Sequence, residues 1–243
     1  MSRIVPAVLP KSHKDFDDTL ALFTLLPDIS RVQIDVVDGK FAAPACWPYT
    51  APHELRDMVE HGWMLPALER IAYEIDLMCL DADRAAEPWV ALGASRLTVH
   101  AESATDLPRL LTSMREYYGC DLVSCDLVSI GVAVNIDTDT TLLERHLDKI
   151  DYVQFMGIAR IGHQGELFDT RVLDKVRAFH KRHPKVDVQI DGGVSLMHAH
   201  ELAALNVSSL IAGSSILRSA DLRAAYTKLE EAFNHLPKGH RVY

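Results

Sequence analysis

The stretch Val186-Asp-Val-Gln-Ile-Asp191-Gly-Gly193, followed by Ile211-Ala-Gly213-Ser214-Ser215, decides how the sequence is interpreted. Each part is a short apolar run that ends in small residues, which predicts two successive strands that each turn into a helix. The glycines let backbone N–H groups approach a ligand with no side chain between them. A strand-to-helix turn of this kind favours phosphate, through its N–H groups and the helix dipole. Asp191 beside such turns indicates proton chemistry on a phosphorylated small molecule.

Similar apolar runs recur along the whole chain, with helical patterns between them. Eight runs predict strands buried on both faces, at residues 4–9, 32–36, 72–78, 96–100, 129–134, 152–155, 186–190 and 209–212. Eight β-α units in a chain of 243 residues match a single (β/α)8 barrel. A doubly wound sheet would need a glycine-rich turn after the first strand, where the sequence is Leu9-Pro-Lys-Ser-His13. We therefore expect one TIM barrel domain over residues 1–243.

Four local signals predict how individual helices begin and end. Ser12 with Asp15 forms a capping-box pattern. Asp169 and Ser195 precede later apolar stripes and predict N-caps, and Asn206 predicts a left-handed residue after a helix. The connection 157–168 is long and holds three glycines, so we expect an active-site loop there.

The composition excludes several classes of partner. A net charge of −9 argues against nucleic acid and against an anionic membrane surface. The sequence has no apolar run long enough for a membrane span and no signal-peptide pattern at its start, so we expect a cytoplasmic protein. The cysteines form no Cys-x-x-Cys pair and are expected to be reduced structural thiols: Cys46, Cys79, Cys120 and Cys125. A homo-oligomer is expected because barrels of this size often associate.

Polar side chains gather where the predicted strands end, which is the active-site face of a barrel. They are Gln33, Asp35, Asp76, His100, Glu102, Asn135 and Asp191. A single Asp at a strand end can instead cap the next helix, and Asp76 has the alternative of pairing with Arg70. His100 is equally compatible with the core, and Met78 and Met156 are expected to pack rather than to hold a cofactor. Three Asp residues from three strands nevertheless favour a functional site.

Two opposed carboxylates with a phosphate grip suit proton abstraction next to a carbonyl. One Asp would remove a proton from carbon, and the other would deliver one from the opposite face. The enediolate between these steps needs positive charge, most simply from a divalent metal ion. The absence of lysine at the inward ends of the fifth and sixth strands argues against a Schiff-base aldolase.

These residues carry a resemblance to the ribulose-phosphate 3-epimerase family. The resemblance runs from Pro6 to Leu217 through segments that are specific only in combination: Ile34-Asp35-Val-Val-Asp38-Gly39-Lys-Phe41, Asp76-Leu-Met78, Val99-His100-Ala-Glu102, Gly131-Val-Ala-Val-Asn135, Asp191-Gly-Gly193 and Ala212-Gly213-Ser214-Ser215. It implies a metal-dependent barrel that acts on a ketose phosphate, with Asp35 and Asp191 as acid/base pair and metal ligands. It also implies a phosphate site formed by Gly162, Gly165, Gly192, Gly193, Gly213 and Ser214.

The sequence departs from the family pattern inside the site. Gln33 and Asp76 stand where the family has metal-binding histidines, Ala7 replaces a substrate-binding serine, and Val37 replaces a methionine. The resemblance then implies an all-oxygen set of Gln33, Asp35, Asp76 and Asp191, which suits magnesium or manganese better than zinc. The alternative is a site without metal. Its three carboxylates would repel one another and raise a pKa, and Lys11, Arg160 or His163 would supply the positive charge.

Three functions compete on this basis. The first is an isomerase that epimerises a ketose phosphate at C3. The second is a barrel that binds a sugar phosphate but has lost the family's metal site and activity, as the missing histidines and Ala7 suggest. The third is a synthase or decarboxylase with the same phosphate grip, which the absence of lysine within Asp35-Val-Val-Asp38 disfavours.

Overall fold

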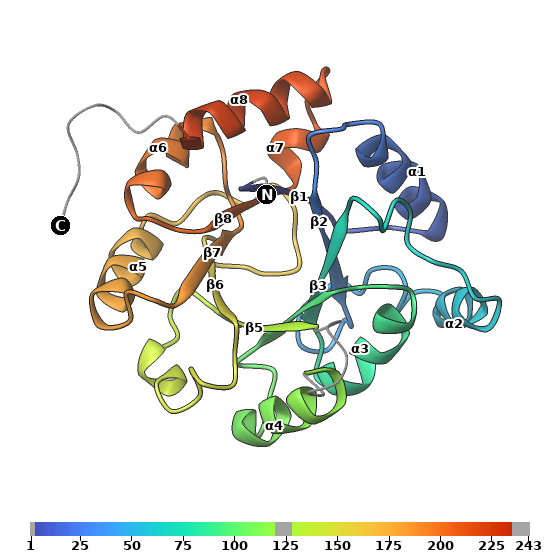
Figure 1. Cartoon of the computed structure of the whole chain (residues 1–243), viewed down its shortest axis with the longest axis horizontal. Coiled ribbons are helices and arrows are strands. Elements are labelled where there is room, and N and C mark those ends of the chain that lie inside the picture. The colour runs from blue at the N-terminus through green and yellow to red at the C-terminus, as the bar shows by residue number, and fades with distance from the viewer. Residues whose placement is uncertain (1–2, 120–127, 235–243) are drawn as a thin grey trace.

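Eight parallel strands close into a barrel with helices around it, as the computed structural model shows for residues 3–119 and 128–234 (Figure 1). The strands run in chain order around the barrel, and β8 pairs with β1 to close it. They are β1 (Ile4–Val8), β2 (Arg31–Val37), β3 (Ala72–Met78), β4 (Arg96–His100), β5 (Ser129–Val134), β6 (Tyr152–Met156), β7 (Asp187–Asp191) and β8 (Ser209–Ala212). The predicted (β/α)8 barrel is confirmed.

Helices connect most successive strands and form the outer layer. They are α1 (His13–Thr24), α2 (Pro52–Glu60), α3 (Ala82–Ala91), α4 (Leu107–Tyr118), α5 (Arg171–Arg182), α6 (Leu196–Ala204), α7 (Ser214–Leu217) and α8 (Leu222–Asn234). Between β5 and β6 the described chain forms only the 3₁₀ helix η1 (Thr140–Leu143). None of the helices within the described ranges is long and apolar enough to cross a membrane.

All eight predicted strands are present, with small differences at their ends. β2 is one residue longer than predicted at each end, because it pairs with β3 from Arg31↔Ala72 to Val37↔Met78. β7 includes Asp191, since that residue pairs with Ile211 of β8. These extensions depend on the neighbouring strand, which the pattern of a single strand does not reveal.

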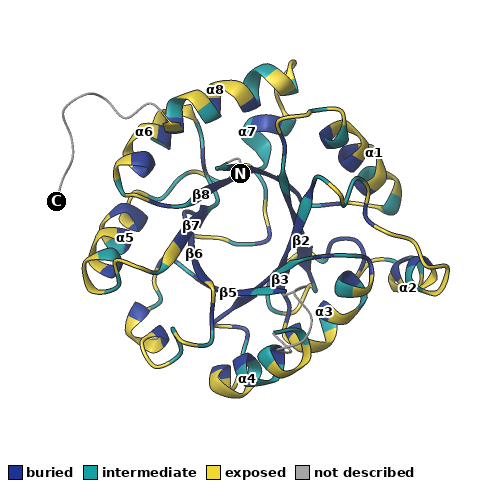
Figure 2. Cartoon of the chain, viewed as in Figure 1, coloured by how far each residue is buried: buried dark blue, intermediate teal, exposed yellow. Residues whose placement is uncertain are grey.

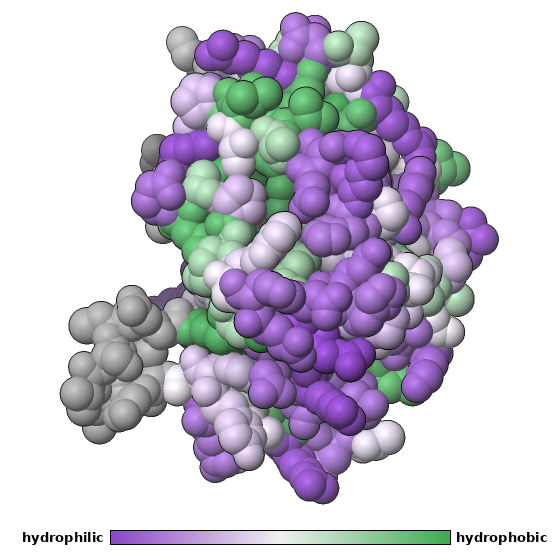
Figure 3. Space-filling view, turned by 90° about the vertical axis from the view of Figure 1, so that its right-hand side faces the viewer, coloured by the Kyte–Doolittle hydropathy of each residue, from purple (hydrophilic) through white to green (hydrophobic). Residues whose placement is uncertain are grey.

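The strands separate the barrel interior from the apolar layer between the strands and the helices. Alternate side chains of a strand point to opposite faces, so Val32, Ile34 and Val36 of β2 pack under the helices while Gln33 and Asp35 face the barrel interior. Figure 2 shows the buried strands surrounded by helices whose outer faces are exposed. The outer face in Figure 3 is mostly hydrophilic, as expected for an amphipathic helical layer.

The predicted helix signals have mixed outcomes. The Ser12 hydroxyl accepts a hydrogen bond from the Asp15 amide at 3.2 Å, as the capping box predicts, but the Asp15 carboxylate accepts from the Lys11 amide instead of from Ser12. Asn206 has a φ of 57°, which confirms its prediction. Ser195 occupies the N-cap of α6, but its hydroxyl contacts His198 instead of a helix amide. Thr170 is the N-cap of α5, and Asp169, one position earlier, accepts from the Arg171 amide.

Candidate active site

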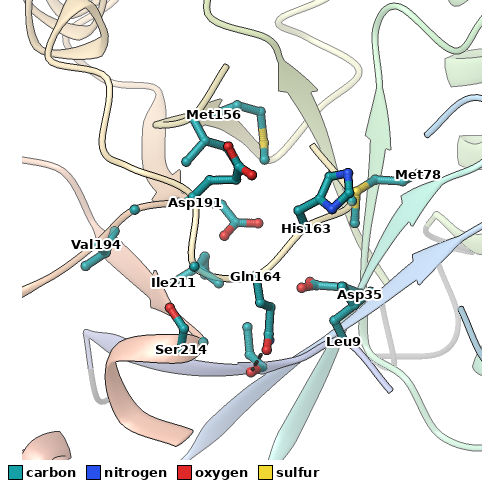
Figure 4. Close-up of a pocket in the computed structure, with 18 residues that line it drawn as sticks. Leu9, Asp35, Met78, Met156, His163, Gln164, Asp191, Val194, Ile211 and Ser214 are labelled. Carbon is teal, nitrogen blue, oxygen red and sulfur yellow. Dashed lines mark hydrogen bonds between the residues drawn. The ribbon is translucent and has the colours of Figure 1, made fainter. Parts of the chain in front are cut away.

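A small cavity of about 50 Å³ lies at the carboxyl ends of the strands. Asp35 and Asp191 reach it from different strands, with Met78 and Met156 beside them (Figure 4). Both methionines line the cavity and pack in small buried apolar clusters, in agreement with the expectation that they pack. The structure also brings every glycine or serine of the predicted phosphate site to this cavity: Gly162, Gly165, Gly192, Gly193, Gly213 and Ser214.

The two carboxylates are joined by an amide. Gln33 lies two residues before Asp35 on β2, so both side chains point into the barrel. The Gln33 Nε2 donates to Asp35 Oδ1 at 2.8 Å and to Asp191 Oδ2 at 2.9 Å. A single NH₂ group of Gln33 therefore links the two carboxyl groups.

Asp76 lies deeper and is fully buried. It is next to Asp35 because β2 and β3 pair with Asp35 opposite Asp76. His100 Nε2 lies 3.0 Å from Asp76 Oδ1, and Gln154 Nε2 donates to Asp76 Oδ2 at 2.9 Å. The predicted alternative, a pair between Asp76 and Arg70, is wrong, because Arg70 donates to backbone carbonyls near the end of α1.

The clustered charges shift the protonation of the site. Burial, followed by the charges of Asp191 and Asp76, raises the pKa of Asp35 well above its usual range. Burial and the Asp76 charge raise the pKa of Asp191 to about 8. Burial disfavours a charged His100, but the Asp76 carboxylate outweighs it and raises the pKa of that imidazole. The site therefore holds protons near neutral pH.

The donor set fits a hard divalent cation. One oxygen from each of Asp35, Asp76 and Asp191 lies within 4.8 Å of the others. Gln33 Oε1 is buried and has no hydrogen-bond partner within the described part of the chain. Rotation of this amide would turn Oε1 toward Asp35 and Asp191 and complete a set of four oxygen donors. Carboxylate and amide oxygens are the ligands that magnesium and manganese prefer.

Two backbone turns form the opposite wall of the cavity. Gly193, just after β7, has a φ of +67°, and a Cβ there would lie 2.6 Å from the Phe168 Cα. Glycine is thus required by both conformation and space. Gly213 is the N-cap of the short helix α7, and a Cβ there would lie 2.8 Å from Gln164 Nε2.

The 157–168 connection lies over the cavity. Ile158 and residues 162–166 line it, and Gln164 Nε2 donates to the Ala7 carbonyl of β1 at 3.3 Å. Of the three cations expected to supply charge, His163 alone lines the cavity. Arg160 pairs with Glu166 at 2.6 Å on the exposed side, and Lys11 is absent from the described lining.

Two residues predicted at strand ends serve the scaffold instead. The Glu102 carboxylate accepts from the backbone N–H of Asn135 at 2.7 Å, and Lys175 donates to the backbone carbonyl of Asn135. Neither Glu102 nor Asn135 is among the described residues that line the cavity.

Gln154 is the main site residue that sequence reasoning missed. Its amide contacts Asp76 and also Asp191, at 3.2 Å. The available signal was its position two residues before Met156, which places both side chains on the same face of β6. An isolated polar residue within an apolar run did not stand out as functional.

The fold and site together define a class: a (β/α)8 barrel with an acidic cluster and glycine turns at the active-site end of its strands. The model of the ribulose-phosphate 3 epimerase family matches residues 3–217. The chain belongs to this family, which supports a sugar-phosphate epimerase or a related function. Ribulose-phosphate 3-epimerase of Escherichia coli K12 is 26% identical over 225 residues, covering 90% of this chain and 91% of the relative. Its counterpart in Bacillus subtilis strain 168 is 24% identical over 239 residues, covering 94% and 98%.

Solved structures support the fold. KGPDC from Streptococcus mutans has a TM-score of 0.66 at 15% identity, covering 96% of this chain and 97% of that one. For 3-hexulose-6-phosphate synthase from Salmonella typhimurium, the TM-score is 0.66 at 14% identity, with coverage of 96% and 98%.

Proposed function

We propose that the protein epimerises a ketose phosphate at C3, with Asp35 and Asp191 exchanging protons with the substrate carbon. One observation carries the proposal: the two carboxylates come from β2 and β7 and meet across one cavity lined by the predicted phosphate turns. Family membership supports the same class of reaction.

The protonation of the pair suits this role. Epimerisation through an enediolate needs a base on one face of the carbon and an acid on the other. Raised pKa values at Asp35 and Asp191 favour a pair that shares a proton, so that one group is ionised while the other is protonated. The same two groups exchange roles when the reaction runs in reverse.

The glycine turns would hold the phosphate end of the substrate. The amides at Gly192, Gly193, Gly213 and Ser214 border the cavity, and the loop glycines Gly162 and Gly165 face them. This grip would fix C3 between the two carboxylates. Met78 and Met156 would give the sugar chain an apolar wall.

Asp35, Asp76 and Asp191, together with Gln33 through Oε1, would hold a divalent cation, for which magnesium or manganese is the better match. Such an ion would stabilise the negative charge of the enediolate. His100, which contacts Asp76, would neutralise part of the charge of that carboxylate.

The test incubates ketose phosphates, starting with D-ribulose 5-phosphate, in D₂O with Mg²⁺, Mn²⁺ or Zn²⁺ and follows deuterium at C3 by NMR. Incorporation is expected with at least one substrate. It should fall at least about 100-fold in Asp35→Asn and in Asp191→Asn, because each variant lacks one acid/base group.

The absence of deuterium at C3 for all substrates and metals would overturn the proposal. Thermal stabilisation by a sugar phosphate without exchange would then favour a binding protein, which is the alternative suggested by Gln33 and Ala7.

A further inference from the structure

Three of the chain's four glutamines, Gln33, Gln154 and Gln189, lie inside the barrel with 1% or less of their surface exposed. A buried amide must satisfy an NH₂ group at one end and a carbonyl oxygen at the other. Its direction therefore matters, because exchanging the two ends would set an oxygen against another acceptor or two donors against each other.

The deepest partner in this interior is Glu74 of β3, which is fully buried. Arg96 Nε lies 3.0 Å from its Oε2, and the Thr98 hydroxyl donates to its Oε1 at 3.2 Å. Arg31 Nε lies 3.8 Å from Oε2. A carboxylate flanked by two guanidinium groups accepts hydrogen bonds only. Any amide that contacts Glu74 must present its NH₂ group.

Gln189 of β7 meets this requirement. Its Nε2 donates to Glu74 Oε1 and to Gln154 Oε1, the latter at 2.8 Å. Its own Oε1 faces Arg96 Nη2 at 3.5 Å. An acceptor on one side and a donor on the other leave the Gln189 amide with a single satisfied direction.

Gln154 inherits its direction from Gln189. Because its Oε1 accepts the Gln189 hydrogen bond, its Nε2 must face the other way. There it donates to Asp76 Oδ2 at 2.9 Å and to Asp191 Oδ2 at 3.2 Å. A chain of hydrogen bonds thus runs from Glu74 through Gln189 and Gln154 to two acids of the proposed active site.

Gln33 provides the contrast. Its Nε2 donates to Asp35 and Asp191, but its buried Oε1 has no hydrogen-bond partner among the described residues. Of the two amides that contact Asp191, Gln154 is therefore held at both ends, whereas Gln33 is held only at its NH₂ end.

We propose that Glu74 and Gln189 are positioning residues that hold the Gln154 NH₂ group against Asp76 and Asp191. For catalysis the proposal rests on the proposed function, because a fixed Asp191 would keep its carboxylate aligned with C3 during proton transfer. Phosphate binding would be unaffected, since the glycine turns lie outside the chain of hydrogen bonds.

The first test needs no substrate. Side-chain NH₂ signals of the four glutamines are assigned in ¹⁵N-labelled protein, and their exchange with solvent is measured. In the wild type, Gln154 should exchange at least tenfold more slowly than Gln164, which is on the loop and partly exposed. Gln189→Met should remove this protection while filling the same space. Tyr152→Phe is the matched control. It removes a buried hydroxyl bonded to Thr98 but none of the hydrogen bonds that link Glu74, Gln189 and Gln154.

The second test measures C3 exchange. Gln154→Met and Gln189→Met should lower kcat about 10- to 100-fold while KM changes less than about threefold, and Tyr152→Phe should retain wild-type values. Glu74→Gln, which removes the acceptor-only anchor, serves if Gln189→Met fails to fold.

The outcomes separate the two proposals. Fast exchange of Gln154 in the wild type, or protection that survives Gln189→Met, would overturn the positioning role. A rise in KM with unchanged kcat would overturn it as well. If the wild type turns over no ketose phosphate, the proposed function fails, while the NMR result alone still decides the positioning of Gln154.

Discussion

Asp191 accepts hydrogen bonds from two glutamine amides and still holds a proton near neutral pH. The bond from Gln33 stabilises its ionised form, but burial and the Asp76 charge outweigh that bond and raise the pKa to about 8. In the unfolded chain the same carboxyl has its usual pKa near 4. The folded state therefore binds more protons than the unfolded state between these two values, and the free energy of unfolding falls as the pH rises through this window.

Asp191→Asn should stabilise the metal-free protein while removing its activity. The amide mimics the protonated carboxyl at every pH, so the variant avoids the loss of stability that builds up in the wild type between the unfolded pKa near 4 and the folded pKa of about 8. In EDTA, its Tm should exceed that of the wild type by several degrees at pH 9, and by little at pH 5. Thermal unfolding between pH 5 and 9 measures this. Asp187→Asn, an exposed position on β7, is the control, and an equal rise in Tm there would contradict the explanation.

Cys46 and Cys79 should resist thiol reagents in the folded protein. Burial is the first cause that raises the pKa of each thiol to about 12, and both cysteines are free. Since the thiolate is the reactive form, modification at pH 8 should be at least about 100-fold slower than in urea. Peptide mapping after alkylation measures each site separately. The cysteines at 120 and 125 lie outside the described residues.

At the scale of the element, the turn after β7 depends on one glycine. Gly193 combines a left-handed backbone with close contact to Phe168, which ends the loop over the cavity. Gly62, after α2, has nearly the same φ, at +68°, but a Cβ added there would meet no described atom within 4 Å. A comparison of substitutions at Gly193 and Gly62 therefore separates the cost of backbone strain from the cost of steric contact.

Gly62→Ala should cost about 1 kcal/mol of unfolding free energy, from the left-handed backbone alone. Gly193→Ala should cost about 3 kcal/mol or more, because the turn must also move away from Phe168. It should weaken inorganic phosphate binding as well, whereas Gly62→Ala should not. Urea denaturation and calorimetric titration measure the two effects. Equal costs at the two positions would show that the contact with Phe168 is unimportant.

The strands were predictable, but much of the site between them was not. Apolar runs mark all eight strands, and polar residues at their ends mark Asp35, Asp76 and Asp191. Gln154 and Gln189 sit within such runs, where a polar residue interrupts the pattern without indicating what it contacts. Their contact follows from the β6–β7 register, which pairs them directly. The pairing of His100 with Asp76 likewise needs the positions of β3 and β4, which sequence spacing alone does not supply.

For the stability of the whole molecule, where a charged group lies matters more than how many charged groups there are. Many ion pairs join exposed side chains, such as Arg177 with Asp174 at 2.6 Å. Glu74 instead sits with Arg96 inside the barrel. Burial opposes ionisation of Glu74, but Arg96 and Arg31 outweigh it and lower its pKa. A group of this kind stabilises the fold above its unfolded pKa, and the contribution is lost as the pH falls.

Arg96→Met should destabilise the protein by about 3–5 kcal/mol, since it leaves the Glu74 charge buried with only Arg31 nearby. Arg177→Met should change stability by less than about 0.5 kcal/mol. The effect of Arg96→Met should shrink as the pH falls through the unfolded pKa of a glutamate, about 4.3, because the wild type then loses the stabilisation that an ionised Glu74 provides. Chemical denaturation at pH 7 and at pH 3.5 measures both. Equal losses for the two arginines would contradict the assignment of Glu74 as an ionised core group.

The Arg96 guanidinium lies 3.9 Å from the centre of the Tyr152 ring, and the ring has room there because position 131 on the neighbouring strand is glycine. A Cβ at Gly131 would lie 2.1 Å from the ring. We therefore expect these two positions to vary together among relatives. Relatives that retain an aromatic residue at 152 should keep glycine at 131, and those with a larger residue at 131 should carry a smaller one at 152. In an alignment of the family, covariation between positions 131 and 152 would thus show which members share this buried arrangement of charge.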